Sequence, residues 1–430
     1  MKLLIKNCVI LPMGGAHPWI ENGFLIAENG RILQLGEGEA PQAAYDRVID
    51  GHNRVLMPGL VNTHTHAAMT LLRGYADDLP LMEWLQTKVW PLEAKLTGED
   101  IYWGSLLAIA EMLRSGTTCF ADMYFFMDRV AQAVEESGMR AVLSRGMIGV
   151  GPESELAFSE SRTLVEKWHR QAGERISFML GPHAPYTCPP EYLKRVTLLA
   201  DQLGVGIHIH LAETRGEFDD IMRDYGLSPT AHLQACGVMD RPVLAAHCVH
   251  LTPEDINILE KHKVGVAHNP QSNMKLASGI APVPEMLAAG IAVSLGTDGA
   301  SSNNDLDLIQ EMRSASLLHK VNTMDPTVVP AYQALEMATV HGSRALGLEK
   351  EIGCLAPGMK ADMILLKLDV PHMLPRYDLV ANLVYSSQAG DVDTVIIDGR
   401  IIMENRQIKT FDEAEVLRQV QLRAIRLADG

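Results

Sequence analysis

Two histidines separated by one residue, His64 and His66, close the apolar run "PGLVNTHTH". Alternate residues of a strand point to the same side, so both imidazoles can face one metal ion. The pair alone is a weak signal, because two histidines on a strand can equally be ordinary hydrogen-bonded side chains. Its meaning therefore depends on what the rest of the chain places beside it.

Later apolar runs also end in residues that can bind a metal or move a proton. These residues are His183, His210 followed by Glu213, His247, His268 and Asp298. Three imidazoles and one carboxylate suit zinc or another divalent first-row ion and leave a place for water. We therefore predict that His64, His66, His210 and Asp298 hold one divalent ion per subunit, with zinc as the expected metal.

The elements that must bring these residues together are eight short apolar strands with helical patterns between most of them. The strands are expected at 59–66, 116–123, 140–147, 176–183, 205–213, 242–250, 263–269 and 291–298. Eightfold alternation of strand and helix predicts an α/β fold, a parallel (β/α)8 barrel of the TIM type. Active sites of such barrels lie at the C-terminal strand ends, where the polar residues occur.

Three further histidines have less defined roles. His208 shares a strand face with His210 but lies one layer deeper, so we interpret it as structural. For His250 and His268 two roles stay open, either orienting a metal ligand or simple packing.

Both chain ends are rich in short strands. Apolar or alternating runs occur at 2–11, 23–35 and 47–57, and again at 361–368 and 394–403, with Asn29-Gly30 and Asp398-Gly399 as tight turns. We expect both ends to build one small β-sandwich. The predicted domains are residues 1–57 and 349–405 for the two parts of the sandwich, 58–348 for the barrel, and 406–430 for a closing amphipathic helix.

Composition excludes several classes of function. The 430 residues carry a net charge of -16 without a basic stripe, so nucleic-acid binding is not expected. The N-terminus does not read as a signal peptide, and we expect no membrane span. The six cysteines form no CxxC pair, which predicts free thiols in a reducing cytoplasm. The sequence allows a homo-oligomer but does not define one.

Five motifs together resemble the amidohydrolase superfamily, in the branch that acts on ring amines. They are "PGLVNTHTH", "GPHAPYTC", "HIHLAET", "AHCVHL" and "GTDGASSNNDLDL". Within that branch, residues 69–97 are similar to deaminases of 5′-methylthioadenosine and S-adenosylhomocysteine. Binuclear members carry a carbamylated lysine on strand four, where this chain offers His183 and no lysine, so the resemblance implies a single metal.

The resemblance implies hydrolytic removal of the adenine 6-amino group, which gives an inosine-type product and ammonia. It assigns Asp298 both to the metal and to the acceptance of a proton from the attacking water. Glu213 is implied to donate a proton to the ring nitrogen beside the attacked carbon. His247 is implied to polarise the reacting centre, and His183 to contact the base or the ribose.

Substrate recognition is implied for five more residues. Glu93 matches a carboxylate that accepts both ribose hydroxyls, and Ser302 is expected in the pocket wall. Trp84 is expected either to pack on the nucleoside or to belong to the core. Arg145 matches a residue that reaches the homocysteine carboxylate. Arg162 is the nearest candidate for a second such arginine, but the loop "GVGPESELAFSES" leaves the alignment ambiguous.

Two alternatives remain open from the sequence. The first is a related aminohydrolase or chlorohydrolase acting on guanine, another purine or pyrimidine, or an s-triazine, for which Glu93 would have no ribose to bind. The second is a non-catalytic scaffold, which the intact ligand set disfavours. The sequence does not rank methylthioadenosine, S-adenosylhomocysteine and adenosine.

Overall fold

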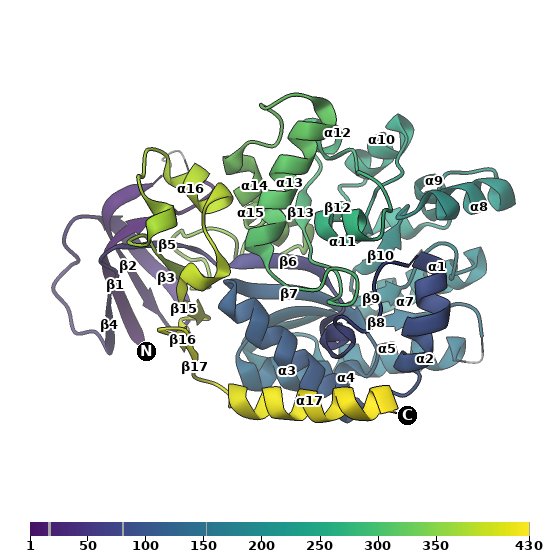
Figure 1. Ribbon diagram of the computed structural model, residues 1–430, viewed down its shortest axis with the longest axis horizontal. Helices are drawn as coiled ribbons and strands as arrows, with labels where there is room; N and C mark the ends of the chain where they lie inside the picture. Colours follow the sequence, from purple (N-terminus) through teal and green to yellow (C-terminus); the bar gives the residue numbers. More distant parts are fainter. Residues whose placement is uncertain (16–18, 80, 152, 430) are drawn as a thin grey trace.

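Two sheets organise the molecule, one parallel and one mixed, with the helices around the parallel one (Figure 1). The computed structural model describes residues 1–15, 19–79, 81–151 and 153–429. Within these residues the barrel takes the middle of the chain, and the mixed sheet takes strands from both ends.

The eight parallel strands confirm the predicted barrel strands in order and number. They are β6 (Leu60–Thr65), β7 (Thr117–Tyr124), β8 (Arg140–Met147), β9 (Ile176–Pro182), β10 (Ile207–Leu211), β11 (Val243–His247), β12 (Gly265–His268) and β13 (Val293–Leu295). Nearly all of their residues are buried. Burial on both faces explains why these strands are continuously apolar rather than alternating.

The barrel closes between its first and last strands through side chains and loops. The Asn62 amide donates to Thr297 Oγ1 at 2.8 Å, and Thr63 Oγ1 donates to the Leu295 carbonyl at 2.9 Å. The Asp298 N–H donates to the His64 carbonyl at 2.9 Å. This closure therefore places His64 and Asp298, two of the predicted metal ligands, side by side.

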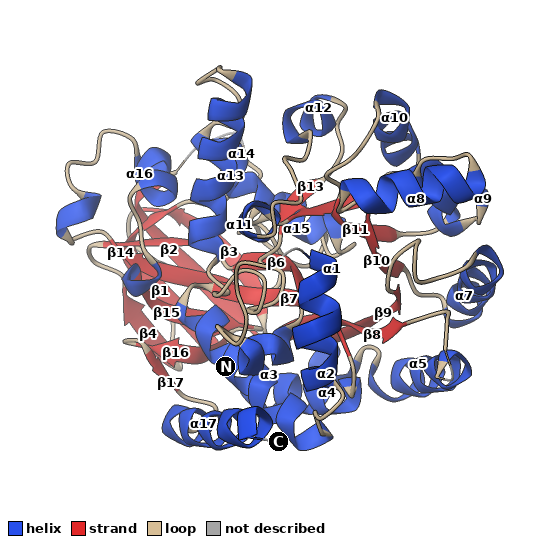
Figure 2. Cartoon of the chain, turned by 45° about the vertical axis from the view of Figure 1, so that its right-hand side comes forward, coloured by secondary structure: helices blue, strands red, loops and turns tan. Residues whose placement is uncertain are grey.

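Helices surround the barrel strands (Figure 2). The α-helices are α1 (Leu81–Trp84), α2 (Trp90–Glu93), α3 (Gly98–Arg114), α4 (Met127–Ser137), α5 (Ser154–Trp168), α6 (Gln171–Glu174), α7 (Pro190–Leu203), α8 (Arg215–Tyr225), α9 (Pro229–Ala235), α10 (Pro253–Lys261), α11 (Pro270–Lys275), α12 (Val283–Ala288), α13 (Leu308–Thr323), α14 (Ala331–Met337), α15 (Val340–Ala345), α16 (Leu379–Tyr385) and α17 (Glu413–Asp429). Shorter turns are the 3-10 segments η1 (Ala67–Leu72), η3 (Val238–Asp240), η4 (Pro371–Met373) and η5 (Ala389–Asp391), and the π-helical η2 (Leu85–Val89).

The mixed sheet joins the two ends of the chain. Its strands are β1 (Lys2–Ile10), β2 (Ile20–Glu28), β3 (Arg31–Glu37), β4 (Arg47–Asp50), β5 (Arg54–Pro58), β14 (Met363–Lys367), β15 (Val392–Ile397), β16 (Arg400–Glu404) and β17 (Gln407–Ile408). Antiparallel pairing of β5 with β14 joins both ends into one nine-stranded sheet. Both ends contribute as predicted. The domain limits 1–57, 58–348, 349–405 and 406–430 stay our proposal.

Both predicted tight turns form hairpins in this sheet. Asn29 and Gly30 have φ of 51° and 80°, and Asp398 and Gly399 have φ of 51° and 70°. Two successive positive φ values are the type I′ geometry that Asn-Gly and Asp-Gly favour. The turns lie against each other, because a Cβ added at Gly399 would approach the Gly30 Cα to 3.1 Å.

A buried ion pair ties the mixed sheet to the barrel. Arg140 donates from Nε to Asp362 Oδ2 at 2.7 Å and from Nη2 to Oδ1 at 3.1 Å, and the side chains are only 4% and 2% exposed. Removing one partner of such a pair costs about 3–5 kcal/mol, because the other charge stays buried alone. The pair therefore fixes the start of β8 against the end strands.

The predicted closing helix is α17, which lies along α3 at the edge of the barrel (Figure 1). Arg114 of α3 forms two 2.6 Å hydrogen bonds with Glu413, and Arg426 of α17 contacts Asp100 of α3 at 2.5 Å. In the part of the chain that the structure describes, no helix has the length and apolar character to cross a bilayer. The six cysteines are free thiols, as predicted.

Candidate metal and catalytic site

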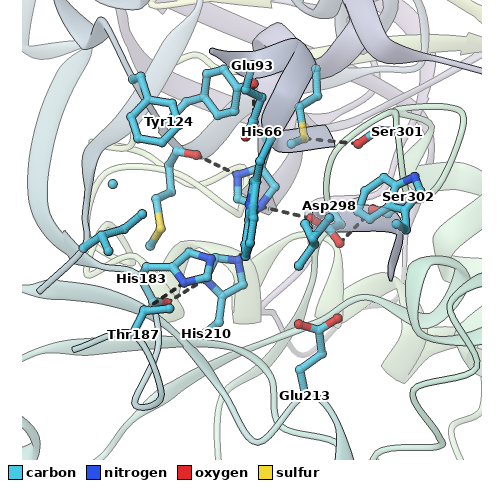
Figure 3. Close-up of a pocket in the computed structure, with 18 of the residues that line it drawn as sticks. His66, Glu93, Tyr124, His183, Thr187, His210, Glu213, Asp298, Ser301 and Ser302 are labelled. Carbon is cyan, nitrogen blue, oxygen red and sulfur yellow. Dashed lines mark hydrogen bonds and ion pairs between the residues drawn. The ribbon is translucent and has the colours of Figure 1, made fainter. Parts of the chain in front are cut away.

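One cavity of about 360 Å³ opens at the C-terminal ends of the barrel strands (Figure 3). Most of the predicted site residues line it, namely His66, Trp84, Glu93, His183, His210, Glu213, His247, Asp298 and Ser302. His64 is fully buried and lies against His66 and His210. The barrel thus brings together residues that the sequence separates by more than 200 positions.

Four imidazoles and one carboxylate converge at the cavity floor. Ligand atoms of His64, His66 and Asp298 lie within 4.8 Å of one another, and so do those of His64, His210 and His247. The Nε2 atoms of His66 and His210 are 3.3 Å apart. All four predicted ligands therefore meet, and His247, which the sequence analysis assigned to another role, also lies within reach.

Each imidazole is oriented by a hydrogen bond at its Nδ1 atom. His66 Nδ1 lies 2.6 Å from the Met123 carbonyl, and His210 Nδ1 lies 2.8 Å from the His183 carbonyl. A carbonyl only accepts, so these Nδ1 atoms carry the proton and the Nε2 lone pairs point to the centre. His247 Nδ1 lies 2.9 Å from Asn273 Oδ1, and because an amide oxygen only accepts, the proton is again on Nδ1.

His64 is oriented by a second histidine. Its Nδ1 lies 2.9 Å from His208 Nε2, and His208 Nδ1 lies 3.5 Å from Ser144 Oγ. His208 therefore supports a predicted ligand from the layer below it, as the sequence analysis expected. With Nδ1–H of His64 donated to His208, His64 Nε2 presents a lone pair to the centre.

The unpaired atoms at the centre fit a divalent cation. The Nε2 atoms of His64 and His247 are buried and have no hydrogen-bond partner among the described residues. Leaving such an atom unsatisfied costs about 1–3 kcal/mol. Burial lowers the pKa of His64 to about 4 and that of His210 well below its usual value, so both are neutral, as metal ligation requires.

Asp298 is held by both carboxylate oxygens. Oδ1 lies 3.5 Å from His64 Nε2 and 3.3 Å from His66 Nε2. Oδ2 accepts hydrogen bonds from Ser272 at 2.7 Å and from Ser302 at 2.9 Å. Burial alone would raise the pKa of Asp298, but the surrounding histidines hold it well below its usual range. The carboxylate is therefore ionised and turned toward the histidines.

Glu213 reaches the cavity from a loop that another glutamate fixes. The buried Glu217 carboxylate accepts the backbone N–H groups of Ala212 and Glu213, both at 2.9 Å, while Ala212 has a left-handed φ of 50°. Glu213 Oε2 lies 3.9 Å from His247 Nε2. Burial raises the pKa of Glu213, which favours a proton on this carboxyl group.

Glu93 and Glu213 lie on either side of His66 and Asp298 in the cavity (Figure 3). The Tyr124 hydroxyl donates to Glu93 Oε1 at 2.6 Å. Trp84 lines the same wall and donates its indole N–H to the Ala76 carbonyl at 2.9 Å, and it is largely buried. Trp84 therefore belongs to the core and also borders the cavity, and its packing on a nucleoside stays a prediction.

The two arginines predicted for the homocysteine carboxylate lie outside the cavity lining. Arg145 donates from Nε to Glu160 Oε2 at 2.8 Å and from Nη1 to the Gly146 carbonyl. Arg162 donates to Gln202 on α7 at 2.7 Å, at an exposed position. The structure therefore brings neither guanidinium into the pocket wall.

The two histidines with open roles each form one side-chain hydrogen bond, and neither bond reaches a predicted metal ligand. His250 Nε2 pairs with the Ser278 carbonyl at 2.8 Å. His268 Nε2 lies 3.2 Å from His319 Nε2 on α13, and His268 is not part of the cavity lining.

Several residues that shape the site escaped the sequence analysis. Tyr124, Ser272, Asn273 and Glu217 each hold a predicted site residue. One signal was available for Glu217, since "TRGE" has the T-x-x-E spacing of a helix start, with Thr214 as the N-cap of α8. The roles of Tyr124, Ser272 and Asn273 could be recognised only from the fold.

The chain resembles known proteins along nearly its whole length. A 5-methylthioadenosine/S-adenosylhomocysteine deaminase of Syntrophomonas wolfei is 65% identical over 428 residues, which cover 99% of each chain. The crystal structure of a zinc-bound adenosine deaminase from Xanthomonas campestris has a TM-score of 0.95 at 36% identity and covers 100% of this chain and 99% of its own. An atrazine chlorohydrolase of Arthrobacter aurescens shares the fold, with a TM-score of 0.91 at 23% identity over 98% of this chain and 100% of its own.

A family model also matches most of the chain. The model described as the amidohydrolase family matches residues 55–402, which contain all eight barrel strands, β14 and β15, and most of β5 and β16. With this match and the full-length relatives, the chain belongs to the amidohydrolase family.

Proposed function

We propose that this enzyme removes the 6-amino group from the adenine ring of 5′-methylthioadenosine and S-adenosylhomocysteine by hydrolysis. The observation that carries the proposal is that one cavity holds the histidine and carboxylate cluster, Glu213 and Glu93 together. The relatives' names support the same reaction. Adenosine is a further expected substrate, since it differs only at the 5′ position.

We also propose that the cluster holds one zinc ion per subunit through His64, His66, His210 and Asp298. The bound zinc of the Xanthomonas campestris structure supports this choice. A divalent ion at such a site supplies Lewis acidity and lowers the pKa of water toward neutrality.

Asp298 and Glu213 are suited to two different proton transfers. Asp298 is ionised and faces the histidines through Oδ1, which suits it to accept a proton from the attacking water. Glu213, with its raised pKa, is suited to donate a proton to the ring nitrogen beside the attacked carbon. His247, next to Glu213, is suited to polarise the same centre, and His183 to contact the base or the ribose.

Glu93 carries the substrate part of the proposal. Tyr124 donates to Oε1 of this carboxylate, and among the described residues no hydrogen bond reaches Oε2, which is therefore open to hydroxyl donors in the cavity. A carboxylate that accepts two vicinal hydroxyls recognises a ribose, whereas a free base or a triazine offers none. Ser302 lines the wall while it holds Asp298.

The alternative with a specific basis is a related hydrolase of guanine, another free base or an s-triazine. The metal cluster would serve these reactions equally well, so only the ribose contact separates the hypotheses. A non-catalytic scaffold does not explain why the buried Nε2 atoms of His64 and His247 lack a hydrogen-bond partner among the described residues.

The test is a panel of methylthioadenosine, S-adenosylhomocysteine, adenosine, adenine, guanine and a triazine, followed by ultraviolet absorbance. We expect turnover of the nucleosides. Glu93→Ala should lower kcat/KM for methylthioadenosine by about 10- to 100-fold, because a hydrogen bond to a charged group is worth about 1.5–3 kcal/mol. Any turnover of adenine should change little.

Glu83→Ala serves as the matched control, because Glu83 lies exposed on α1 of the same helical segment. It should leave both substrates unaffected. Equal losses for nucleoside and free base in Glu93→Ala would contradict the ribose contact, and turnover of guanine or the triazine alone would favour the alternative.

Glu217→Gln is expected to lower kcat about 10- to 100-fold with little change in KM or metal content. Glutamine has one acceptor oxygen for the two N–H groups of Ala212 and Glu213, and its NH₂ group would face a buried donor. The loop that carries Glu213 should therefore shift. Initial rates and metal analysis of the purified variant measure both effects.

Asp255→Asn is the control for general destabilisation. Asp255 is a buried carboxylate at the same helix position, in the capping box of α10, away from the cavity. This variant should melt at a lower temperature but keep kcat. If the two variants lose stability alike and both keep kcat, Glu217 is merely structural.

A further inference from the structure

Strand β6 is irregular at the point where it carries the first two predicted metal ligands. Asn62 pairs with Phe120 in the ladder between β6 and β7. The next pair joins Thr65 to Asp122, so β6 advances by three residues where β7 advances by two. The additional residue forms a bulge, and bulges are common next to active sites, where they re-aim a side chain. The position of His66 therefore depends on how the chain is fixed just beyond the bulge.

Asp122 fixes the chain on both sides of His66. Its Oδ1 atom accepts a hydrogen bond from the Ala67 N–H at 2.6 Å. The Thr65 hydroxyl is shared between the same Oδ1 atom, at 2.9 Å, and the Ala121 carbonyl, at 2.8 Å. The carbonyl of the next residue in β7 accepts from His66 Nδ1 at 2.6 Å. The end of β7 thus holds both the backbone and the ring of this predicted ligand.

The start of η1 needs an acceptor that His66 does not supply. His66 directly precedes η1, and among the described residues its side chain forms no capping hydrogen bond. Its Nδ1 atom is bound to a carbonyl, and its Nε2 atom faces Asp298 and the other predicted ligands. The Ala67 N–H, at the first position of η1, has no acceptor within the helix. The fully buried carboxylate of Asp122 therefore supplies this acceptor from the neighbouring strand.

We propose that Asp122 is a positioning residue for the metal site, which holds His66 where its Nε2 atom meets those of His64 and His210. This inference deepens the proposed single-zinc site and rests on the proposed function. Without the carboxylate, the Ala67 N–H loses its acceptor, and the backbone that carries His66 shifts. Groups that orient metal ligands typically contribute about 10- to 100-fold to metal affinity.

The first test measures the zinc dissociation constant of the purified enzyme by competition with a coloured chelator. Asp122→Ala removes the acceptor and should raise this constant about 10- to 100-fold. Asp122→Asn keeps an oxygen that can accept from Ala67, so its constant should stay within about fivefold of the wild-type value. A wild-type constant in Asp122→Ala, or an equal increase in both variants, overturns the inference.

Asp100→Ala is the matched control. Asp100 is also buried, and one of its oxygens accepts the N–H of Thr97 at 2.7 Å and the hydroxyl of Thr97 at 2.6 Å. It lies at the start of α3 and does not line the cavity. This variant should melt at a lower temperature and keep the wild-type zinc dissociation constant. If it loses zinc affinity as much as Asp122→Ala does, the affinity reports only general stability and the inference fails.

The second test follows the arrangement of the ligands with cobalt(II) in place of zinc. The visible absorption of bound cobalt(II) depends on ligand geometry, so the spectrum of Asp122→Ala should differ from that of the wild type. The spectra of Asp122→Asn and Asp100→Ala should not differ. An unchanged spectrum in Asp122→Ala overturns the inference.

Thr65→Val decides the question if Asp122→Ala does not fold. It removes the second donor to the carboxylate and should raise the zinc dissociation constant about threefold, the effect of one ordinary hydrogen bond. An unchanged constant in this variant then overturns the inference. Wild-type protein that binds neither zinc nor cobalt(II) overturns the proposed metal site and the inference with it. Wild-type protein that binds zinc but deaminates no nucleoside overturns the proposed function alone.

Discussion

Replacing Asp298 by Asn is expected to lower kcat about 10³- to 10⁴-fold and to reduce the bound metal. The amide keeps the size of the side chain and can still accept hydrogen bonds from Ser272 and Ser302. It cannot take a proton from water, and general-base catalysis contributes about 10²- to 10⁴-fold. It also removes the negative charge that faces His64 and His66. Initial deamination rates and metal content by mass spectrometry measure the two effects.

Asp307→Asn provides the matched control. Asp307 lies nine residues further along the same segment and caps α13 by accepting the Ile309 N–H at 2.9 Å, a role that asparagine fills equally well. This variant should keep its rate and its metal. An Asp298→Asn enzyme within tenfold of the wild-type rate would contradict the assignment of Asp298 as the proton acceptor.

Glu213→Gln is expected to lower kcat about 10²- to 10⁴-fold while the metal stays bound. The amide can still hydrogen-bond to the ring nitrogen but cannot transfer a proton to it. KM should change less than kcat, because the lost interaction matters mainly as the transition state forms. The measurement is the kcat and KM of methylthioadenosine deamination, with metal content determined on the same preparation.

The control for Glu213 is Glu254→Gln, an exposed glutamate in the first turn of α10. It should behave as the wild type in rate, KM and metal content. If Glu213→Gln loses its metal together with its activity, the carboxylate acts on the metal cluster rather than on the ring.

The sequence predicted the barrel because its pattern repeats. Each barrel strand is a short apolar run between helical segments, and the polar residues at the strand ends needed only the general geometry of the barrel to meet. That is why His64, His66, His210 and Asp298 could be named together. The tight turns at Gly30 and Gly399 were equally predictable, since their residues favour a positive φ.

The supporting contacts were not predictable in the same way. Whether Arg145 enters the cavity depends on where α5 places Glu160, and no local pattern fixes the position of one helix against a neighbouring strand. His247, which joins the cluster, has a left-handed backbone with φ of 72°, and a local sequence pattern does not predict this uncommon conformation for a residue other than glycine. Residues such as Tyr124 and Asn273 carry no motif and act only through the side chains that they hold.

The pairing of β5 with β14 has a consequence for synthesis on the ribosome. Met363 pairs with Pro58, so β5 can pair with β14 only after some 300 further residues have been synthesised. At about 5–20 residues per second, that delay is roughly 15–60 seconds. Throughout this time the edge of β5 is available to strands of other chains, a known route to aggregation. Expression at a high level should therefore cause more aggregation of the nascent chain than of the folded enzyme.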